Sequence, residues 1–185
     1  MLEGMARAVP ETHGEILAAA ARRFAVTGYK GTSLQDIARA VGCSKATVLY
    51  HFANKEALLC ELMAPAIAAL EALDARLADA TGAAAQEIAG ERFVDLAVRF
   101  RREIALLRGE FPDLLQQPAF AHIQQISERL IAAFAGNSDR PSARIAALVV
   151  LAGIAETCGE FIDIPDDELR PALLAVVRRA LEPVT

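Results

Sequence analysis

Residues 44 to 51 combine short polar side chains with positive charge in a pattern that suits the binding of nucleic acid. Ser44, Lys45 and Thr47 stand at the start of a short predicted helix, and such side chains hydrogen-bond phosphates and base edges. Tyr50 and His51 follow one turn later and can hydrogen-bond phosphate. No nucleophile or acid is spaced to work with His51, so the pattern indicates binding rather than catalysis.

The short helix, predicted over residues 45–52, needs an apolar side that holds it on a supporting module. Val48, Leu49 and Phe52 are spaced to provide that side. Ser44 is expected to cap the helix at its N-terminus. Asn54 is expected to cap the next helix, which begins at Lys55 and whose N-terminal backbone N–H groups favour anions. The sequence thus predicts a polar face carried on an apolar base.

Two further helices are predicted before this one. The first covers residues 11–27 and ends at Gly28, because glycine adopts the left-handed backbone that closes helices. Thr32 is expected to cap the second helix, with Gln35 completing a capping box. Gly42 ends that helix and leads through a tight turn into the helix at residue 45. Two short helices joined in this way after a packing helix form a helix-turn-helix pattern.

The rest of the chain is also predicted to be helical, so the expected fold class is all-α. Hydrophobic residues make up 54% of the 185 residues, and alanine and leucine, both strong helix formers, dominate them. Helices are expected over residues 55–80 with a bend at Pro65, and over 84–109, 118–135 and 141–162. A last helix begins between residues 165 and 171 and ends near residue 182.

The distribution of charge separates two parts of the chain. The formal net charge of −5 speaks against a uniformly basic protein. All three lysines nevertheless fall in the first third of the chain, at Lys30, Lys45 and Lys55. Residues 1–63 carry seven basic and six acidic side chains, and twelve basic and eighteen acidic side chains follow. This asymmetry predicts an anion-binding N-terminal module attached to an acidic body.

Residues 16–59 closely resemble the DNA-binding domain of the TetR/AcrR family of bacterial transcriptional regulators. The residues that carry the resemblance are Phe24, Gly28, Tyr29, Thr32, Ser33, Ile37, Ala38, Gly42, Ser44, Thr47, Leu49, Tyr50, His51, Phe52, Lys55, Glu56 and Leu58. Cys43 stands where the family usually has a valine, and Ala46 where glycine is common. Ala46 has no donor, so at most it contributes an apolar contact, such as one with a thymine methyl group.

The resemblance implies a ligand-responsive transcriptional regulator, a repressor that a small hydrophobic effector releases from its operator. It implies a helix-turn-helix domain of three helices over residues 1–54 and a larger helical domain for ligand binding and dimerisation over residues 55–185. A homodimer would place two recognition helices in successive major grooves of a partly palindromic double-stranded DNA operator. The residues expected to contact DNA are Thr32, Ser33, Ser44, Lys45, Ala46, Thr47, Tyr50, His51 and Lys55.

The last two predicted helices carry more apolar surface than one intramolecular partner requires. The resemblance assigns this surface to pairing with a second copy, through Ile145, Leu148, Val149, Ala152, Leu173, Val176, Val177 and Ala180. A second apolar stripe on the helix over residues 141–162 consists of Val150, Ile154, Cys158 and Phe161. The residues expected near the effector are Arg99, Phe100, Phe111, His122, Gln125 and Cys158, and the phenylalanines could equally be core.

Other interpretations stay open at this point. The polar side chains of residues 45–55 could form a solvated face. His122 and Cys158 could belong to a metal sensor, and the acidic run at 163–168 could bind Ca²⁺, although it lacks the spacing of an EF-hand loop. We expect no metal, no cofactor and no enzymatic activity. The competing classes are a helical small-molecule-binding protein or enzyme that uses the N-terminal helices structurally, and a protein-protein scaffold.

Cysteine usage and hydropathy bear on location. The three cysteines are far apart and odd in number, so no disulfide framework is expected, and a reducing cytoplasm fits best. The longest uncharged apolar run, residues 145–155, is shorter than the roughly 20 residues that a membrane span needs. The sequence therefore predicts a buried helix there and no membrane partner.

Overall fold

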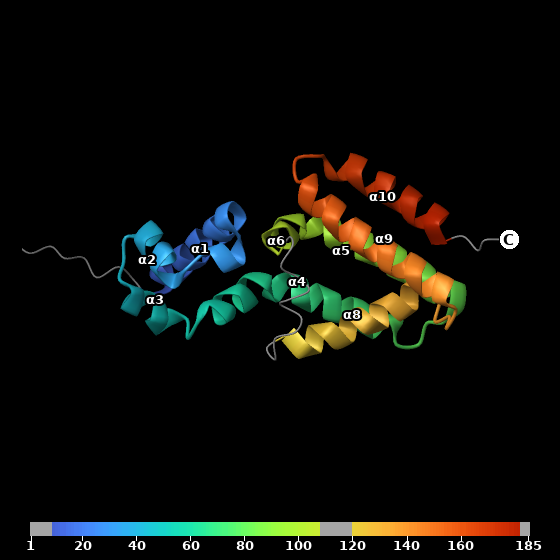
Figure 1. Ribbon diagram of the computed structural model, residues 1–185, viewed down its shortest axis with the longest axis horizontal. Helices are drawn as coiled ribbons and strands as arrows, with labels where there is room; N and C mark the ends of the chain where they lie inside the picture. The colour runs from blue at the N-terminus through green and yellow to red at the C-terminus, as the bar shows by residue number, and fades with distance from the viewer. Residues whose placement is uncertain (1–8, 108–119, 182–185) are drawn as a thin grey trace, which may run out of the picture. The chain divides into compact units, whose positions relative to one another are not determined.

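The computed structural model describes residues 9–107 and 120–181, with the backbone alone for residues 9–11, and every regular helix in these ranges is drawn in Figure 1. No strand occurs in them, so the predicted all-α class is confirmed. The helices are α1 (Val9–Gly31), α2 (Leu34–Val41), α3 (Lys45–His51), α4 (Lys55–Leu77), α5 (Gly82–Arg99), α6 (Arg101–Leu106), α8 (Ala121–Phe134), α9 (Pro141–Glu160) and α10 (Asp166–Leu181).

The chain divides into two compact units, Met1–Ala64 and Pro65–Thr185, which we call the head and the body. The division falls inside α4, ten residues after the boundary expected at residue 54. The first turns of α4 belong to the head because Leu58 and Leu59 are fully buried there. Pro65, which has no backbone N–H to continue the helical hydrogen bonds, stands at the division.

In the head, α1 packs against α2, and α2 packs against α3. Gly28 interrupts α1 with φ 74° and ψ 163°, a backbone that favours glycine, and one more helical turn follows to Gly31. Val48 and Phe52, four residues apart, are buried and hold α3 in place. Leu49 was expected beside them but is 43% exposed, because on a helix the next residue points about 100° away from Val48.

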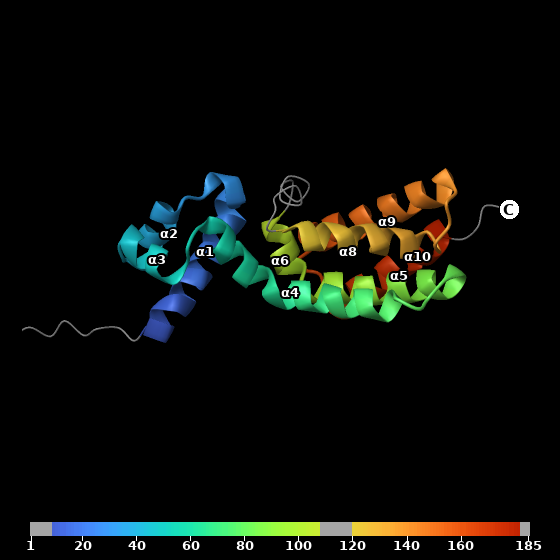
Figure 2. The same cartoon turned by 90° about the horizontal axis from the view of Figure 1, so that it is seen from below.

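In the body, α8, α9 and α10 run alongside α5, as Figures 1 and 2 show. The predicted helix over residues 84–109 is divided at Phe100, whose backbone at φ −107° and ψ 24° separates α5 from α6. Neither glycine nor proline signals this break. Gly90 on α5 lets α10 approach closely, since a Cβ there would lie 2.9 Å from Cγ1 of Val177. The later part of α4 is tied to α8 by Arg129, whose Nε donates to Asp74 Oδ1 at 2.7 Å.

The apolar helix α9 is part of this core on one side only. Val150, Ile154 and Cys158 of the second stripe are buried in it, whereas Phe161 just beyond the helix is 47% exposed. Among the described residues, α9 is the one helix long and apolar enough to cross a membrane by length and composition. Its buried side identifies it as a partly buried core helix of the body.

Candidate DNA-binding site

The N-terminus of α3 is organised by the predicted cap. Ser44 Oγ accepts the backbone N–H of Thr47 at 3.0 Å and lies 2.9 Å from Thr47 Oγ1, so the cap at Ser44 is confirmed. Lys45 and Ala46 are exposed beside it. Tyr50 is 78% exposed one turn later. The polar face predicted for this helix is therefore open to a partner.

The other end of α3 is fixed by aromatic packing. The ring of His13 on α1 stacks on Phe52 with 4.5 Å between ring centroids and meets His51 edge-on at 5.7 Å. His13 Nε2 lies 2.6 Å from Glu61 Oε1 on α4. His51, half-buried, also meets Tyr50 edge-on at 5.3 Å. These contacts join the end of α3 to α1 and, through His13, α1 to α4.

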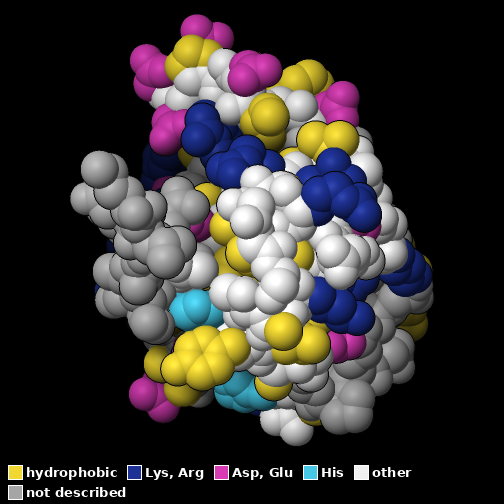
Figure 3. All heavy atoms as spheres, turned by 90° about the vertical axis from the view of Figure 1, so that its left-hand side faces the viewer, with side chains coloured by type: hydrophobic (Ala, Val, Ile, Leu, Met, Phe, Trp, Pro, Cys, Tyr) yellow, Lys and Arg dark blue, Asp and Glu magenta, His cyan; other side chains and the backbone are white. Residues whose placement is uncertain are grey.

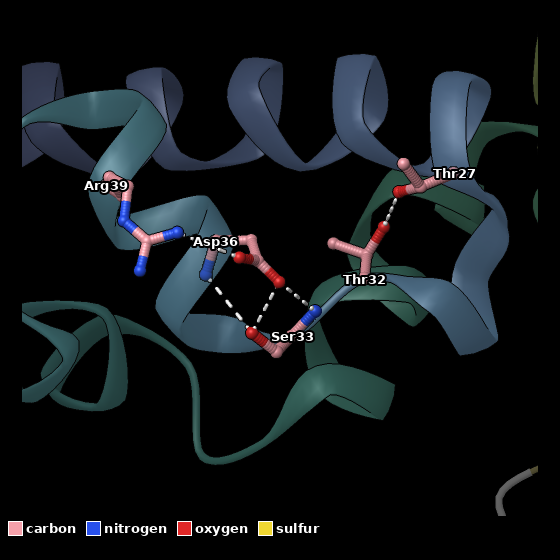
Figure 4. A network of polar contacts seen from close by, with 5 residues as sticks. All are labelled: Thr27, Thr32, Ser33, Asp36 and Arg39. Carbon is pink, nitrogen blue, oxygen red and sulfur yellow. Dashed lines mark hydrogen bonds and ion pairs between the residues drawn. The ribbon is translucent and has the colours of Figure 1, made fainter.

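The cap of α2 lies one residue later than predicted. Ser33, not Thr32, is the N-cap, and Asp36, not Gln35, completes the capping box (Figure 4). Ser33 Oγ accepts Asp36 N–H at 3.2 Å, and Asp36 Oδ2 accepts the Ser33 backbone N–H at 3.1 Å. Carboxylates suit this position because the helix dipole favours negative charge there. Ser33 remains exposed at the start of the helix.

Thr32 is a structural residue. Its side chain is 2% exposed, and its hydroxyl donates to the carbonyl of Gly28 at 2.8 Å and lies 2.7 Å from Thr27 Oγ1. The expectation that this side chain contacts DNA is therefore not supported, because the hydroxyl is buried and engaged inside the head. Figure 4 shows Thr32 and Thr27 pointing toward one another.

Lys55 also makes internal contacts. Its ammonium group donates to the carbonyls of Tyr29 at 2.7 Å and Thr32 at 2.9 Å, and it lies 4.2 Å from the centre of the Tyr29 ring. The side chain is half-buried. Lys55 thus ties the start of α4 to the segment that joins α1 to α2. The cap expected from Asn54 is confirmed, since Asn54 Oδ1 accepts Ala57 N–H at 2.7 Å.

Basic side chains of the head surround an additional hollow that the sequence pattern did not single out. It measures about 170 Å³ and is lined by Arg23, Asp36, Arg39 and Ala40. Hydrogen bonds from Ser33, and then the charges of Arg39 and Arg23, hold the pKa of Asp36 below its usual value. Asp36 and Arg39 are three residues apart on α2 and form an ion pair, whereas Arg23 comes from α1 and is brought there by the fold.

The residues expected to bind an effector do not converge. Arg99, His122 and Gln125 are exposed, and His122 Nε2 lies 2.9 Å from Glu71 Oε1. Phe100 is buried at the junction of α5 and α6, and Phe111 lies outside the described residues.

Cys158 is fully buried in the core of the body. Burial raises the pKa of its thiol to about 11, and the charge of Arg101 opposes that shift. A thiol with so high a pKa stays protonated at neutral pH and packs as a small apolar group. Cys158 is thus a core residue.

A hollow on the surface of the body lies elsewhere. It measures about 400 Å³, opens between α5 and α10, and contains none of the residues expected near an effector. Arg178 and Glu91 lie on opposite sides of it with 3.9 Å between Nη2 and Oε1.

The residues expected at a dimer interface fall into two groups. Ile145, Leu148 and Val149 on α9 and Val176 on α10 are 50–65% exposed, and Ala152 and Ala180 are exposed with them. Leu173 and Val177 are 6% and 5% exposed and pack inside the body, so their assignment to an intermolecular surface was wrong. Both belong to the face of α10 that meets the core, whereas Val176 lies on the opposite face.

Metal binding finds no support in the parts of the chain that the structure describes. In those parts no three His, Cys, Asp or Glu side chains group together in a way that could hold an ion. Asp166, Asp167 and Glu168 of the acidic run occupy the first turn of α10, where the helix dipole favours them. Asp166 also accepts a hydrogen bond from Arg101 at 2.6 Å.

Figure 3 looks onto the end of the molecule that carries α2 and α3. Lys and Arg side chains lie there in separate groups rather than as one continuous basic surface. Polar, exposed residues at the start of a short helix, with basic groups around them, define a helix-turn-helix DNA-binding protein.

Comparison with known proteins agrees with this class. Residues 16–62 match the family model described as bacterial regulatory proteins of the tetR family. The chain is 26% identical over 125 residues to the HTH-type transcriptional repressor KstR2 of Mycobacterium tuberculosis, a match that covers 66% of this chain and 62% of that relative. Over 52 residues it is 46% identical to the HTH-type transcriptional regulator RutR of Escherichia coli, covering 28% of this chain and 24% of RutR.

Solved structures extend the likeness through the body. The structure of the ketosteroid transcriptional regulator KstR2 of Mycobacterium tuberculosis superposes with a TM-score of 0.68 at 20% identity, covering 89% of this chain and 92% of that one. Residues 16–62 therefore resemble the DNA-binding domain of the TetR family of bacterial regulatory proteins, and the likeness through the body is one of fold. The curated relatives are longer than the stretches matched here, which span less than two thirds of either one.

Proposed function

We propose that this protein is a repressor that binds a partly palindromic operator as a homodimer and leaves it when a small hydrophobic molecule binds the body. The observation that carries the proposal is the exposed, capped N-terminus of α3. Ser44, Lys45, Ala46, Thr47 and Tyr50 present there the hydrogen-bonding and apolar groups that read a major groove. The similar protein KstR2 is a transcriptional repressor, which favours repression over activation.

Ser33, His51 and Lys55 complete the proposed DNA-contacting set. Ser33 is exposed at the start of α2, and its backbone position beside a helix N-terminus suits a phosphate. Lys55 donates to the carbonyls of Tyr29 and Thr32. It therefore both orders the loop before α2 and adds to the field that attracts the duplex.

Pairing of two copies is supported by the exposed apolar face of α9. Ile145, Leu148, Val149 and Ala152 share that face, and Val176 and Ala180 of α10 are exposed as well. Large aliphatic side chains that are more than half exposed on adjacent turns favour burial against a partner. A two-fold pair of this kind places two α3 helices about 34–36 Å apart on DNA, one helical turn.

The effector is proposed to bind in the body near Phe100. Phe100 is buried where α5 gives way to α6, and the interior of the body is built mainly from aliphatic and aromatic side chains. Apolar walls of this kind select hydrophobic ligands. KstR2, which shares the fold, is a ketosteroid transcriptional regulator, and this fits an apolar effector class. Phe100→Ala and His122→Ala should reduce the effect of such a ligand on operator binding, and an unchanged ligand response would contradict the site.

Release requires that the effector bind one arrangement of the dimer more tightly than the other. Helix α4 carries residues of both the head and the body, and Pro65 weakens its hydrogen bonding at the division. A coupling free energy of about 1–3 kcal/mol would change operator affinity roughly 5- to 150-fold.

The three cysteines are free, which agrees with the proposed cytoplasmic location.

Salt dependence of DNA binding tests the proposed function. Affinity for duplex DNA should fall steeply and linearly on a log-log scale as salt rises, because counterions are released from phosphates. Lys45→Ala combined with Lys55→Ala should flatten that slope. Binding of duplex DNA that is absent, or that these substitutions leave unchanged, would contradict the proposal.

A further inference from the structure

The hollow between α1 and α2 has the size and charge of an anion site. Its volume of about 170 Å³ corresponds to about six water molecules at roughly 30 Å³ each. Sites for drug-sized ligands are larger, at roughly 300–1,000 Å³. Arg23 lines it from α1, and Asp36, Arg39 and Ala40 line it from α2. Two guanidinium groups and one carboxylate give the hollow an excess of one positive charge.

The carboxylate in the hollow is occupied by the protein itself. Asp36 Oδ2 accepts the backbone N–H of Ser33 at 3.1 Å and its hydroxyl at 2.6 Å. Asp36 Oδ1 accepts one N–H of Arg39 at 3.2 Å (Figure 4). Both oxygens are therefore engaged, and the carboxylate orients Arg39 rather than filling the hollow.

Both arginines keep donors for a further partner. The guanidinium of Arg39 has five N–H donors, and its side chain is 73% exposed. The Nε of Arg23 is buried without a hydrogen-bond partner in the part of the head that the structure describes. A buried donor that stays unpaired costs free energy, so Arg23 has hydrogen-bonding capacity that the described head does not use. Guanidinium groups pair with phosphate oxygens through two parallel hydrogen bonds.

We propose that Arg23 and Arg39 together bind a backbone phosphate of duplex DNA, next to the bases that α3 contacts. This inference rests on the proposed function. The hollow shares Asp36 with the capping box of Ser33, so it lies beside the exposed start of α2. Phosphate contacts of this kind set the orientation of a reading helix without adding sequence preference.

Binding to a fluorescent duplex of mixed sequence tests the proposal. Arg39→Ala should weaken binding roughly fivefold to tenfold at about 0.1 M salt and lower the log-log salt slope by about 1, equally for every sequence tested. Arg39→Lys keeps the charge but not the paired donors, so it should restore the slope and only part of the affinity. Arg22→Ala is the matched control, because Arg22 is an exposed neighbour of Arg23 outside the hollow.

The outcomes separate this proposal from the function on which it rests. Wild-type protein that fails to bind the duplex would contradict the proposed function. Wild-type binding with a steep slope, together with Arg39→Ala and Arg22→Ala that behave alike, would overturn the phosphate site alone. Inorganic phosphate that shifts the Nε–H NMR signals of Arg23 and Arg39, while Arg39→Ala leaves DNA binding intact, would also overturn it and assign the hollow to a free phosphate.

Discussion

The exposed faces of α3 in the head and α9 in the body have opposite chemistry. On α3, Lys45 and Tyr50 are exposed while Ser44 and Thr47 order the backbone through side-chain hydrogen bonds. On α9 the exposed residues are aliphatic, and Val149 is 65% exposed. A polar face whose backbone is already satisfied suits a hydrated, charged partner, whereas an aliphatic face suits one that excludes water. The two faces therefore require partners of two different kinds.

The largest effect should come from placing charge on the apolar face of α9. Leu148→Glu with Val149→Glu should convert a dimer to a monomer, because two buried carboxylates per copy oppose pairing. Affinity for genomic fragments that the wild-type protein retains should fall roughly 10²- to 10⁴-fold, since the two heads no longer bind as one unit. Light scattering measures the mass, and fluorescence anisotropy measures the affinity.

A control for this change lies in the head. Val26 is 77% exposed on α1, so Val26→Glu adds a carboxylate at an exposed apolar residue of the head. It should leave the mass of the protein unchanged. A double variant on α9 with the mass of the wild type would remove α9 from the dimer interface.

The next largest effect should be a difference in the free energy of unfolding between substitutions on the two faces of α10. In the background of Leu148→Glu with Val149→Glu, where pairing no longer contributes, Leu173→Ala should cost about 2–5 kcal/mol because it leaves a cavity in the core. Val176→Ala should cost less than about 1 kcal/mol, since Val176 is half exposed. Denaturant unfolding measures both variants. Equal losses for the two residues would contradict the inward placement of Leu173.

Alkaline pH should weaken the body through Cys158. The pKa of its thiol is about 11 in the folded protein and near 9 in the unfolded chain, so the folded state keeps a proton that the unfolded state loses. Stability from this group is complete below pH 9 and is lost as pH rises to 11, by about 2–3 kcal/mol. The difference in unfolding free energy between wild type and Cys158→Ala should shrink over that range, and a constant difference would contradict the shift.

The smallest expected changes in the free energy of unfolding concern two lysines of the head, Lys55 and Lys45. Lys55→Met should lower the free energy of unfolding by about 1–2 kcal/mol, because the carbonyls of Tyr29 and Thr32 lose a charged donor. Lys45→Ala should change it by less than about 0.5 kcal/mol, since Lys45 is exposed. Thermal denaturation compares them. An equal loss of unfolding free energy for Lys45→Ala would contradict a stabilising role for the hydrogen bonds of Lys55.

The head was predictable from sequence in its helices and caps, but less so in the burial of single residues. Ser44, Asn54 and Gly28 act as their types and spacing indicated. At the start of α2, threonine and serine stand side by side, and either can cap a helix. Burial of Thr32 against Gly28 and Thr27 decides between them, and that contact depends on the end of α1.

The body was harder to predict because its helices are apolar on more than one side. The pattern of α9 separated Leu148 from Val150 and Ile154, and the structure shows that Leu148 is exposed and the other two are buried. For α10 the same spacing could not show which stripe meets α5, and the close approach at Gly90 puts Val177 inside. The break at Phe100 carries no glycine or proline, so only packing of α6 against α9 reveals it.

The most direct test of a dimer that reads DNA through α3 is footprinting of the genomic fragments that the purified protein retains. We predict two protected half-sites with related, inverted sequences, about 10 base pairs apart from centre to centre or a multiple of that spacing. Lys45→Ala should weaken both half-sites together. A single unpaired half-site, or protection that Lys45→Ala leaves unchanged, would contradict the account.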